Sequence, residues 1–374
     1  NISYIKEVKP ILKMRCAVCH GCYDAPCQLK LTSYEGLKRG TNPELVYDGT
    51  RIQPASPSRL FIDGKNTQDW RNKNFSPIIN ETKKTNAKQN LELSTLYQIL
   101  RLKQINPQPL SGPVSEDIDT SLGREQICSS IDDFDEFAAD HPDWGMPFAF
   151  PNLSHQEYRT LTHWIAQGAK NSPEPTISKK SQQSIHSWET FFNGQSKKQQ
   201  LISRYIYEHL FLSHIHFNGS PKNEFFRLVR SSTPNGQKIN EIATVRPYDD
   251  PKQTFYYRFR HYKPTIVDKN HVVYQLSPQK MQRFKELFFE PKYNVDKLPP
   301  YHPHVASNPF VTFKQLPIKS RYQFLLDDAR FFIEGFVKGP VCRGQVALNV
   351  LEDQFWVFFF DPNTEFSYTD PNFL

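Results

Sequence analysis

The spacing of hydrophobic residues in the first half of the chain is typical of short helices separated by long loops. One helix is expected over residues 1–20, with a kink at Pro10. Another is expected over about 91–103, where apolar side chains recur every three to four positions. A third should begin after Ser154, because Ser154 and Glu157 have the spacing of a capping box.

The second half mixes helical and strand-like patterns. Helices are expected at about 187–212, 278–289 and 318–336. Strands are expected at 225–229, 242–246 and 255–261, in a hairpin of 265–267 with 272–276, and at about 345–350 and 354–360. These patterns predict an α+β fold overall, in which the second half contains a largely antiparallel sheet.

Composition divides the chain into two predicted domains. Residues 170–185 hold few bulky apolar side chains and are interpreted as a linker. The predicted domains are therefore 1–169 and 186–374, and a chain of 374 residues is long enough for both.

The charge pattern limits the classes of partner. The net charge is +7 and the cations are spread along the chain, so binding to a nucleic acid is not expected. Weak attraction to an anionic membrane surface fits this charge, as does an ordinary solubilising surface. The most apolar run, 355–360, is far shorter than the ~20 residues of a membrane-spanning helix and is expected to be a buried strand. Since Asn1 leads straight into an amphipathic segment, we expect a mature or trimmed chain.

The strongest chemical signal is the motif Cys16-Ala-Val-Cys19-His20. C-x-x-C-H attaches c-type haem: the two thiols bond to the two vinyl groups of the porphyrin, and the histidine ligates the iron. A zinc site would need a second close pair of ligands, and Cys22 and Cys27 have the wrong spacing. A thioredoxin-type pair needs no histidine and opens a helix after a strand. Haem c is therefore the favoured interpretation.

A second iron ligand is predicted at Met146. Met14 is too close to the attachment motif, and Met281 lies in the other predicted domain. Met146 lies in a Gly-Met-Pro-Phe loop before an amphipathic helix, an arrangement that resembles class I cytochromes c. The alternative is a methionine that fills a gap in the core. The first domain is thus expected to be mostly helical and cytochrome-c-like, with a long insertion, because 126 residues separate His20 from Met146.

The remaining cysteines point to an oxidising compartment. Haem c is attached on the exported side of the membrane, where structural disulfides persist. The other four cysteines allow three full pairings, between which the sequence does not choose: Cys22, Cys27, Cys128 and Cys342. Their clustering favours a bond from Cys22 or Cys27 to Cys128, and free buried thiols are the alternative.

The segment CAVCHGCYDAPCQLK at 16–30, with Leu31, Ser33, Gly36, Arg39 and Gly40 after it, resembles the start of the bacterial unsaturated fatty acid cis–trans isomerase family. Further similarities are at 203–212, 246–248 and 339–349. The resemblance implies a periplasmic isomerase with one haem c that converts cis double bonds of phospholipid acyl chains to trans during membrane stress, without a nucleotide cofactor. Together with the net charge of +7 and the lack of a spanning run, this apolar substrate leads us to expect peripheral contact with the membrane without insertion. Because family members are longer, this chain is expected to be an N-terminal portion.

Two functional hypotheses remain open from the sequence. An isomerase would use electrophilic ferric iron to lower the order of the double bond. With His20 and Met146 both bound, either Met146 would have to leave or the electron would pass through the porphyrin edge. The alternative is a periplasmic electron-transfer cytochrome with an accessory domain, which suits His/Met ligation. Aromatic residues of the second half are candidates for acyl contact or, more simply, for the sheet core: Tyr205, Tyr207, Phe211, Phe217, Phe255, Tyr257 and Phe259.

Overall fold

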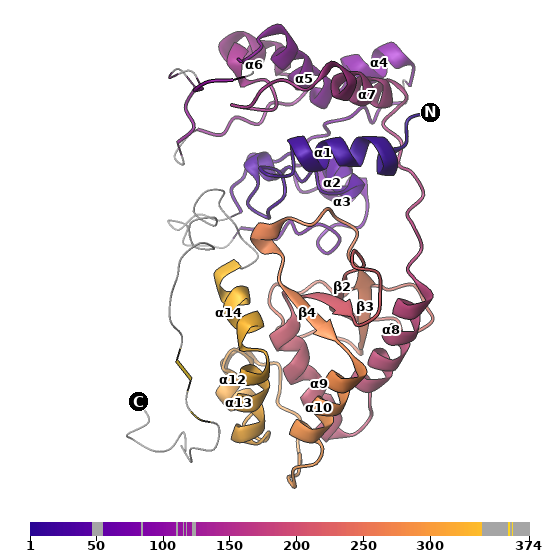
Figure 1. Ribbon diagram of the computed structural model, residues 1–374, viewed down its shortest axis with the longest axis vertical. Coiled ribbons are helices and arrows are strands. Elements are labelled where there is room, and N and C mark those ends of the chain that lie inside the picture. The colour runs from indigo at the N-terminus through magenta and orange to yellow at the C-terminus, as the bar shows by residue number, and fades with distance from the viewer. Residues whose placement is uncertain are drawn as a thin grey trace. The chain divides into compact units, whose positions relative to one another are not determined.

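The computed structural model describes residues 1–46, 55–83, 85–109, 111–114, 116, 118–121, 125–338, 358–359 and 361. These residues form two compact units, and most of their helices and strands are labelled in Figure 1. Unit 1 holds the described residues of 1–175 together with 263–270. Unit 2 holds 176–262 and 271–338. The chain therefore leaves unit 2 after Tyr262, contributes one short segment to unit 1, and returns at His271.

Unit 1 is built from short helices, and its described residues contain no strand beyond one isolated bridge between Thr41 and Ser76. The helices of the unit are η1 (Tyr4–Val8, a π-helix), α1 (Lys9–Arg15), η2 (Pro26–Gln28), α2 (Tyr34–Arg39), α3 (Thr67–Arg71), α4 (Ala87–Glu92), α5 (Thr95–Ile105), α6 (Phe134–Asp140), η3 (Pro142–Trp144), α7 (His155–Ala166) and η4 (Asp268–Asn270).

Capping residues in the sequence set where several of these helices begin. The capping box before α7 is confirmed, because the Ser154 and Glu157 side chains bond reciprocally to backbone N–H groups. The helix expected over 91–103 begins later, at Thr95, since the Ser94 hydroxyl caps it by accepting from Tyr97 N. The first helix changes from π to α geometry just before Pro10.

One hydrophobic cluster, called here the unit 1 core, joins η1 and α1 to α5 and α7. Its buried members include Leu12, Leu96, Leu100, Leu161 and Trp164. Half-buried side chains packed against it include Cys16, Leu29 and Met146. The core therefore brings together residues that lie more than a hundred positions apart in the sequence.

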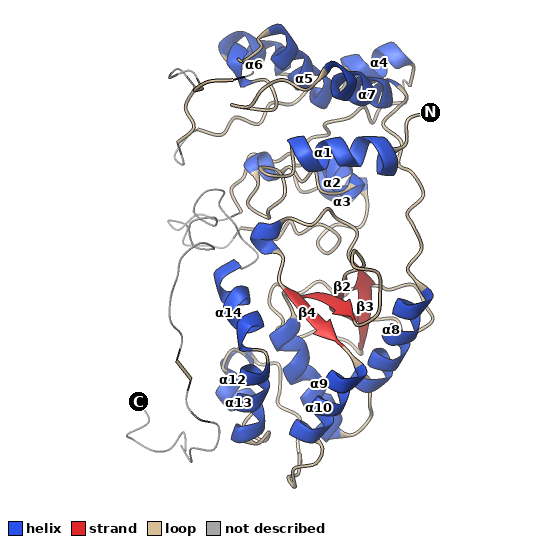
Figure 2. Cartoon of the chain, viewed as in Figure 1, coloured by secondary structure: helices blue, strands red, loops and turns tan. Residues whose placement is uncertain are grey.

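Unit 2 contains a four-stranded sheet (Figure 2) with the strand order β3-β2-β1-β4. The elements of the unit are α8 (Lys179–Phe192), α9 (Lys197–Leu210), β1 (His214–Phe217), β2 (Phe226–Ser231), β3 (Tyr256–His261), β4 (Val273–Leu276), α10 (Pro278–Phe288), α11 (Pro303–Ala306), α12 (Pro309–Thr312), α13 (Ile318–Asp327) and α14 (Ala329–Lys338). The fold class is α+β, as the sequence predicted.

The sheet is mixed rather than largely antiparallel. β1 and β3 pair antiparallel with β2, but β1 pairs parallel with β4, in the register His214 to Val273. The predicted hairpin of 265–267 with 272–276 is wrong, because 265–267 belongs to unit 1 and β4 takes β1 as its partner. Residues 242–246 form no strand, since only a single bridge, Ser231 to Glu241, extends β2 there.

The unit 2 core packs α8, α9, α10 and α13 against the sheet. It includes Tyr205, Tyr207, Phe217, Tyr257 and Phe259, all buried. The simpler interpretation of the aromatic pattern, a sheet core, is therefore correct for these five side chains. Glu189 of α8 adds a buried ion pair, because it accepts from Arg258 Nε at 2.9 Å and from Phe259 N at 3.0 Å.

Several predicted element bounds differ from the structure. The helix expected over 187–212 is two helices, α8 and α9, and α8 begins at Lys179, inside the segment interpreted as a linker. The helix expected over 318–336 is also two, interrupted at Asp328, whose carboxylate accepts from Lys280 Nζ and Tyr274 OH. The closing strand predicted at 345–350 and Cys342 lie outside the described residues, and within 354–360 Phe358 and Phe359 are exposed and in no strand. Across the described helices, none combines the length and the apolar composition needed to span a membrane.

Candidate functional site

The C-x-x-C-H motif forms a tight turn at the end of α1. Cys16 N donates to Leu12 O at 3.0 Å, which continues the helical hydrogen bonding, and His20 N donates back to Cys16 O at 2.9 Å. Neither Cys16 nor Cys19 is in a disulfide; Cys16 is half-buried and Cys19 is exposed. Burial, helped by the neighbouring Cys19, raises the pKa of the Cys16 thiol to about 12. Because neither cysteine is in a disulfide, both sulfur atoms are free to form thioethers.

His20 is oriented by a backbone carbonyl. Its side chain is only 8 % exposed, and Nδ1 lies 3.3 Å from Leu29 O. Burial lowers the pKa of His20 to about 4, against the weaker effect of the Leu29 hydrogen bond, so the imidazole is neutral at physiological pH. With the proton on Nδ1, the lone pair of Nε2 is left for a metal. A carbonyl bonded to one nitrogen is the usual way in which proteins orient a ligating histidine.

These residues fit a c-type haem. The group requires two free thiols three positions apart and a neutral imidazole directly after them, and the turn provides all three. A zinc site fits less well, because the Cys27 sulfur is bonded to Cys128 and is not available as a thiolate. Within the described part of the chain, no group of three or more His, Cys, Asp or Glu side chains could hold a metal ion.

A buried arginine holds the loop that positions His20. Arg39 is fully buried, and its guanidinium donates to Ser58 O at 2.6 Å and to Gln28 O, next to the Leu29 carbonyl. The guanidinium also lies over the Phe75 ring, 4.9 Å from its centroid. Burial lowers the pKa of Arg39 to about 10, which leaves it charged. The sequence predicted no role for Arg39 beyond its place in the family resemblance.

The turn just before Leu29 is fixed from several sides. Cys27 and Gln28 both have positive φ angles, 53° and 49°. The Cys27 carbonyl accepts from Asn42 N at 2.9 Å, and the Gln28 side chain bonds to Glu44 O and Ser58 Oγ. This set of bonds stabilises a backbone conformation that non-glycine residues seldom adopt.

A disulfide ties the same loop to the long insertion. Cys27 is bonded to Cys128 with a Cα–Cα distance of 5.6 Å, which confirms the predicted connection between the two regions. Cys22 is also disulfide-bonded.

Residues 263–270 pack directly on the motif, a contact that the sequence did not predict. Lys269 Nζ donates to the carbonyl of Val18, between the two cysteines, at 3.1 Å. Thr265 N donates to Thr32 O at 2.7 Å. Val267 lies so near Gly21 that a Cβ there would be 2.6 Å from the valine side chain. Gly21 is therefore required by close packing on both sides of the turn.

Met146 lies in the same unit as the motif. Its backbone N donates to Ile99 O on α5 at 3.2 Å, and its half-buried side chain packs on the unit 1 core together with Cys16 and Leu29. The preceding Gly145 lies against α5 so closely that a Cβ would be 2.3 Å from Lys103 N. The loop position is thus well defined, while the role of Met146 as an iron ligand stays a prediction.

An ion pair joins the end of α1 to the start of α7. Arg15 Nε and Nη2 each donate to one oxygen of Glu157, both at 2.9 Å. The Arg15 guanidinium, assisted by the backbone N–H of Ser154, lowers the pKa of Glu157 to about 2. Because Arg15 directly precedes Cys16, this pair fixes the C-x-x-C-H turn relative to α7.

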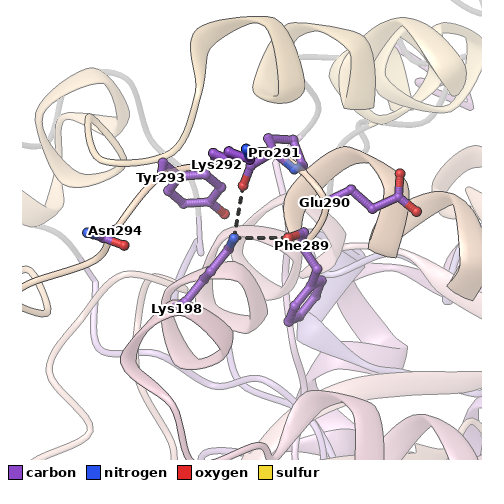
Figure 3. Close-up of a pocket in the computed structure, with 7 residues that line it drawn as sticks. All are labelled: Lys198, Phe289, Glu290, Pro291, Lys292, Tyr293 and Asn294. Atoms are coloured by element: carbon purple, nitrogen blue, oxygen red, sulfur yellow. Dashed lines mark hydrogen bonds between the residues drawn. The ribbon is translucent and has the colours of Figure 1, made fainter.

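A separate cavity in unit 2 has no comparable chemistry. It has a volume of about 480 Å³ and is lined by Lys198, Tyr293 and the neighbouring residues of 289–294 (Figure 3). Lys198 Nζ donates to Phe289 O and Pro291 O, both at 3.1 Å, and lies 4.0 Å from the Tyr293 ring centroid. Its donors are thus used by the protein itself, so the cavity is not a candidate active site.

Comparison with known proteins gives one match. A family model described as Fatty acid cis/trans isomerase (CTI) matches residues 55–374, most of the chain. The matched range includes Met146, Arg258 and Lys269, and begins after the C-x-x-C-H motif. The chain matches no curated protein and no solved structure.

Proposed function

This chain belongs to the fatty acid cis/trans isomerase family, and from that premise we propose that it isomerises unsaturated acyl chains of membrane phospholipids with the help of a haem c. The family membership establishes an isomerase that acts on fatty acids. The observation that supports haem dependence is the buried, neutral His20, whose Nδ1 faces Leu29 O beside two free cysteines.

In this proposal Cys16 and Cys19 would hold the porphyrin by thioether bonds. His20 Nε2 and the Met146 sulfur would be the two protein ligands of the haem iron. When bound, ferric haem supplies an electron-withdrawing centre, which is the chemistry that would weaken a double bond enough for rotation. The protein residues keep the imidazole neutral and oriented, through the Leu29 carbonyl and the Arg39 contacts behind it. Isomerisation consumes no co-substrate, because the trans isomer is the more stable one.

The same proposal places the protein in the periplasm, in peripheral contact with the membrane, where it would stiffen the bilayer under stress. The Cys27–Cys128 disulfide supports an oxidising compartment. A net charge of +7 supports attraction to anionic lipid headgroups.

The test of haem attachment uses the protein from a host that matures c-type cytochromes. Wild type should keep its red colour through acid–acetone extraction, and the Cys16→Ala, Cys19→Ala double variant should lose it. Cys128→Ala, which removes the disulfide but no attachment sulfur, is the matched control and should keep the colour. Free extraction of haem from wild type would contradict the proposal.

The test of function uses vesicles of cis-monounsaturated phosphatidylcholine and gas chromatography of the fatty acids. Wild type should form trans acids and the double cysteine variant should not. Trans product from the haem-free variant would show that isomerisation does not depend on the haem.

Met146 has its own test. If its thioether ligates iron, ferric wild type should show the weak red-edge charge-transfer band of sulfur-bound haem, and Met146→Ala should lose the band and have a lower reduction potential. An unchanged spectrum would exclude Met146 as a ligand.

A further inference from the structure

Lys103 is a buried cation that the proposed function does not yet use. Its side chain is 1 % exposed, and Nζ makes no hydrogen bond with any residue that the structure describes. Lysine is almost never fully buried without a partner, since an ammonium group away from water costs several kcal/mol or more. An arrangement of this kind is expected where an anion arrives with a ligand.

The position of Lys103 on α5 directs it toward the proposed haem site. Leu96, Leu100 and Lys103 recur at helical spacing and form one buried face. The two leucines belong to the unit 1 core, against which Cys16 and Met146 also pack. Side chains on a helix lean toward its N-terminus, so Lys103 leans toward the preceding turn, where Ile99 O accepts from Met146 N.

The part of the chain that the structure describes offers this cation little negative charge. Asp143, in η3 just before Met146, is the described carboxylate that acts on Lys103 electrostatically, and it is exposed and makes no hydrogen bond to Nζ. The backbone of Lys103 is in close contact with two other segments. Lys103 O accepts from Asn152 Nδ2 at 3.1 Å, and Gly145 packs closely against Lys103 N. Among the described residues Nζ therefore has no hydrogen-bond partner, although the structure around it is tightly packed.

We propose that Lys103 is the buried counter-charge for a carboxylate of a ligand bound in unit 1. Two ligands of this enzyme class have such a group: the propionates of haem and the head of a free fatty acid. The inference rests on the proposed function, and its test separates the two sources.

The first arm measures the reduction potential of the purified haem protein without lipid. If Lys103 pairs with a haem propionate, Lys103→Met should lower the midpoint potential, because loss of a nearby positive charge favours the ferric state. Lys103→Arg, which keeps the positive charge, should have a midpoint potential close to that of wild type. The control is Arg101→Met, which removes one charge from the exposed side of the same helix and should leave the potential unchanged. A residue with only a packing role would not produce this charge-dependent pattern.

The second arm measures binding of free oleate and of its methyl ester, which lacks the carboxylate. If Lys103 pairs with the fatty acid, Lys103→Met should weaken binding of oleate at least tenfold and leave the ester unaffected, with no change in potential. Where Lys103→Met does not fold, Lys103→Gln replaces it, because the amide keeps polarity without charge.

The outcomes are distinguishable. A haem-containing Lys103→Met protein with wild-type potential and wild-type affinity for oleate overturns the inference and leaves the proposed function intact. A purified wild type without haem overturns the proposed function, and the oleate arm then still decides the role of Lys103.

Discussion

The ion pair between Arg15 and Glu157 can be used to test how strongly the C-x-x-C-H turn at the end of α1 is fixed to α7. Glu157→Gln keeps the size of the side chain and an oxygen that can still accept from Ser154 N, but removes the charge that Arg15 contacts through two bonds. The variant should therefore lose the ion pair while α7 keeps most of its capping.

The expected loss follows from the pKa of Glu157. Lowering this pKa from its usual 4.5 to about 2 corresponds to about 3 kcal/mol in the free energy of unfolding. The Arg15 and Glu157 side chains are 34 % and 21 % exposed, so solvent screening reduces the contribution to about 1–2 kcal/mol. Since the folded-state pKa is depressed, the contribution is complete above pH ~4.5 and is lost as the pH falls toward 2.

Urea unfolding at pH 7 and at pH 3 measures both the magnitude and the sign. Glu157→Gln should be less stable than wild type by about 1–2 kcal/mol at pH 7, and the difference should shrink at pH 3. Glu92→Gln is the control, because its pair with Lys88 is exposed and longer, 3.6 Å, and should contribute almost nothing. Equal losses in the two variants, or a Glu157→Gln loss that is the same at both pH values, would refute this account of the pair.

Three further predictions concern other charges. Arg39→Met should cost about 3 kcal/mol or more in thermal unfolding, because two buried carbonyls lose their donor, and Arg39→Lys should not restore it; full stability of the lysine variant would contradict this. Glu189→Gln should cost about 2–4 kcal/mol in urea unfolding by leaving Arg258 buried without its counter-charge, and a loss below 1 kcal/mol would count against it. Binding to anionic vesicles should weaken as salt rises, whereas salt-insensitive binding would indicate apolar contact instead.

Features of the fold that depend on residues close together in the sequence could be predicted. The capping box of Ser154 and Glu157 and the start of α10 after Ser277 are local signals, and both are present. The partner of β4 was not predictable in the same way, because parallel pairing with β1 brings together segments nearly sixty residues apart. Residues 265–267 look like half of a hairpin, yet Thr265 donates to Thr32 O, and the nearby Lys269 donates to Val18 O within the C-x-x-C-H motif.

The candidate site shows the same difference between local sequence patterns and contacts of distant segments. Cys16, Cys19 and His20 could be proposed from the sequence because covalent attachment of haem would demand those residue types at that spacing. Arg39 and Lys269 donate to backbone carbonyls, which no residue pattern marks, so the sequence predicted no role for either beyond the place of Arg39 in the family resemblance. Lys103 could have been found, since it continues the apolar stripe of Leu96 and Leu100 with a charge.

Three connections of different chemistry close the long interval between His20 and Met146. The Cys27–Cys128 disulfide spans 101 positions, and closing a loop of that length restricts the unfolded chain by about 4–5 kcal/mol in the entropic description. The Met146 N–Ile99 O bond docks the methionine loop on α5, and the Arg15–Glu157 pair joins α1 to α7. A reductant acts on the first, acid weakens the third, and neither changes the backbone bond that locates Met146. The position of the methionine loop should therefore resist both conditions, whereas a reductant frees the insertion from the loop at Cys27 and acid weakens the connection of α1 to α7.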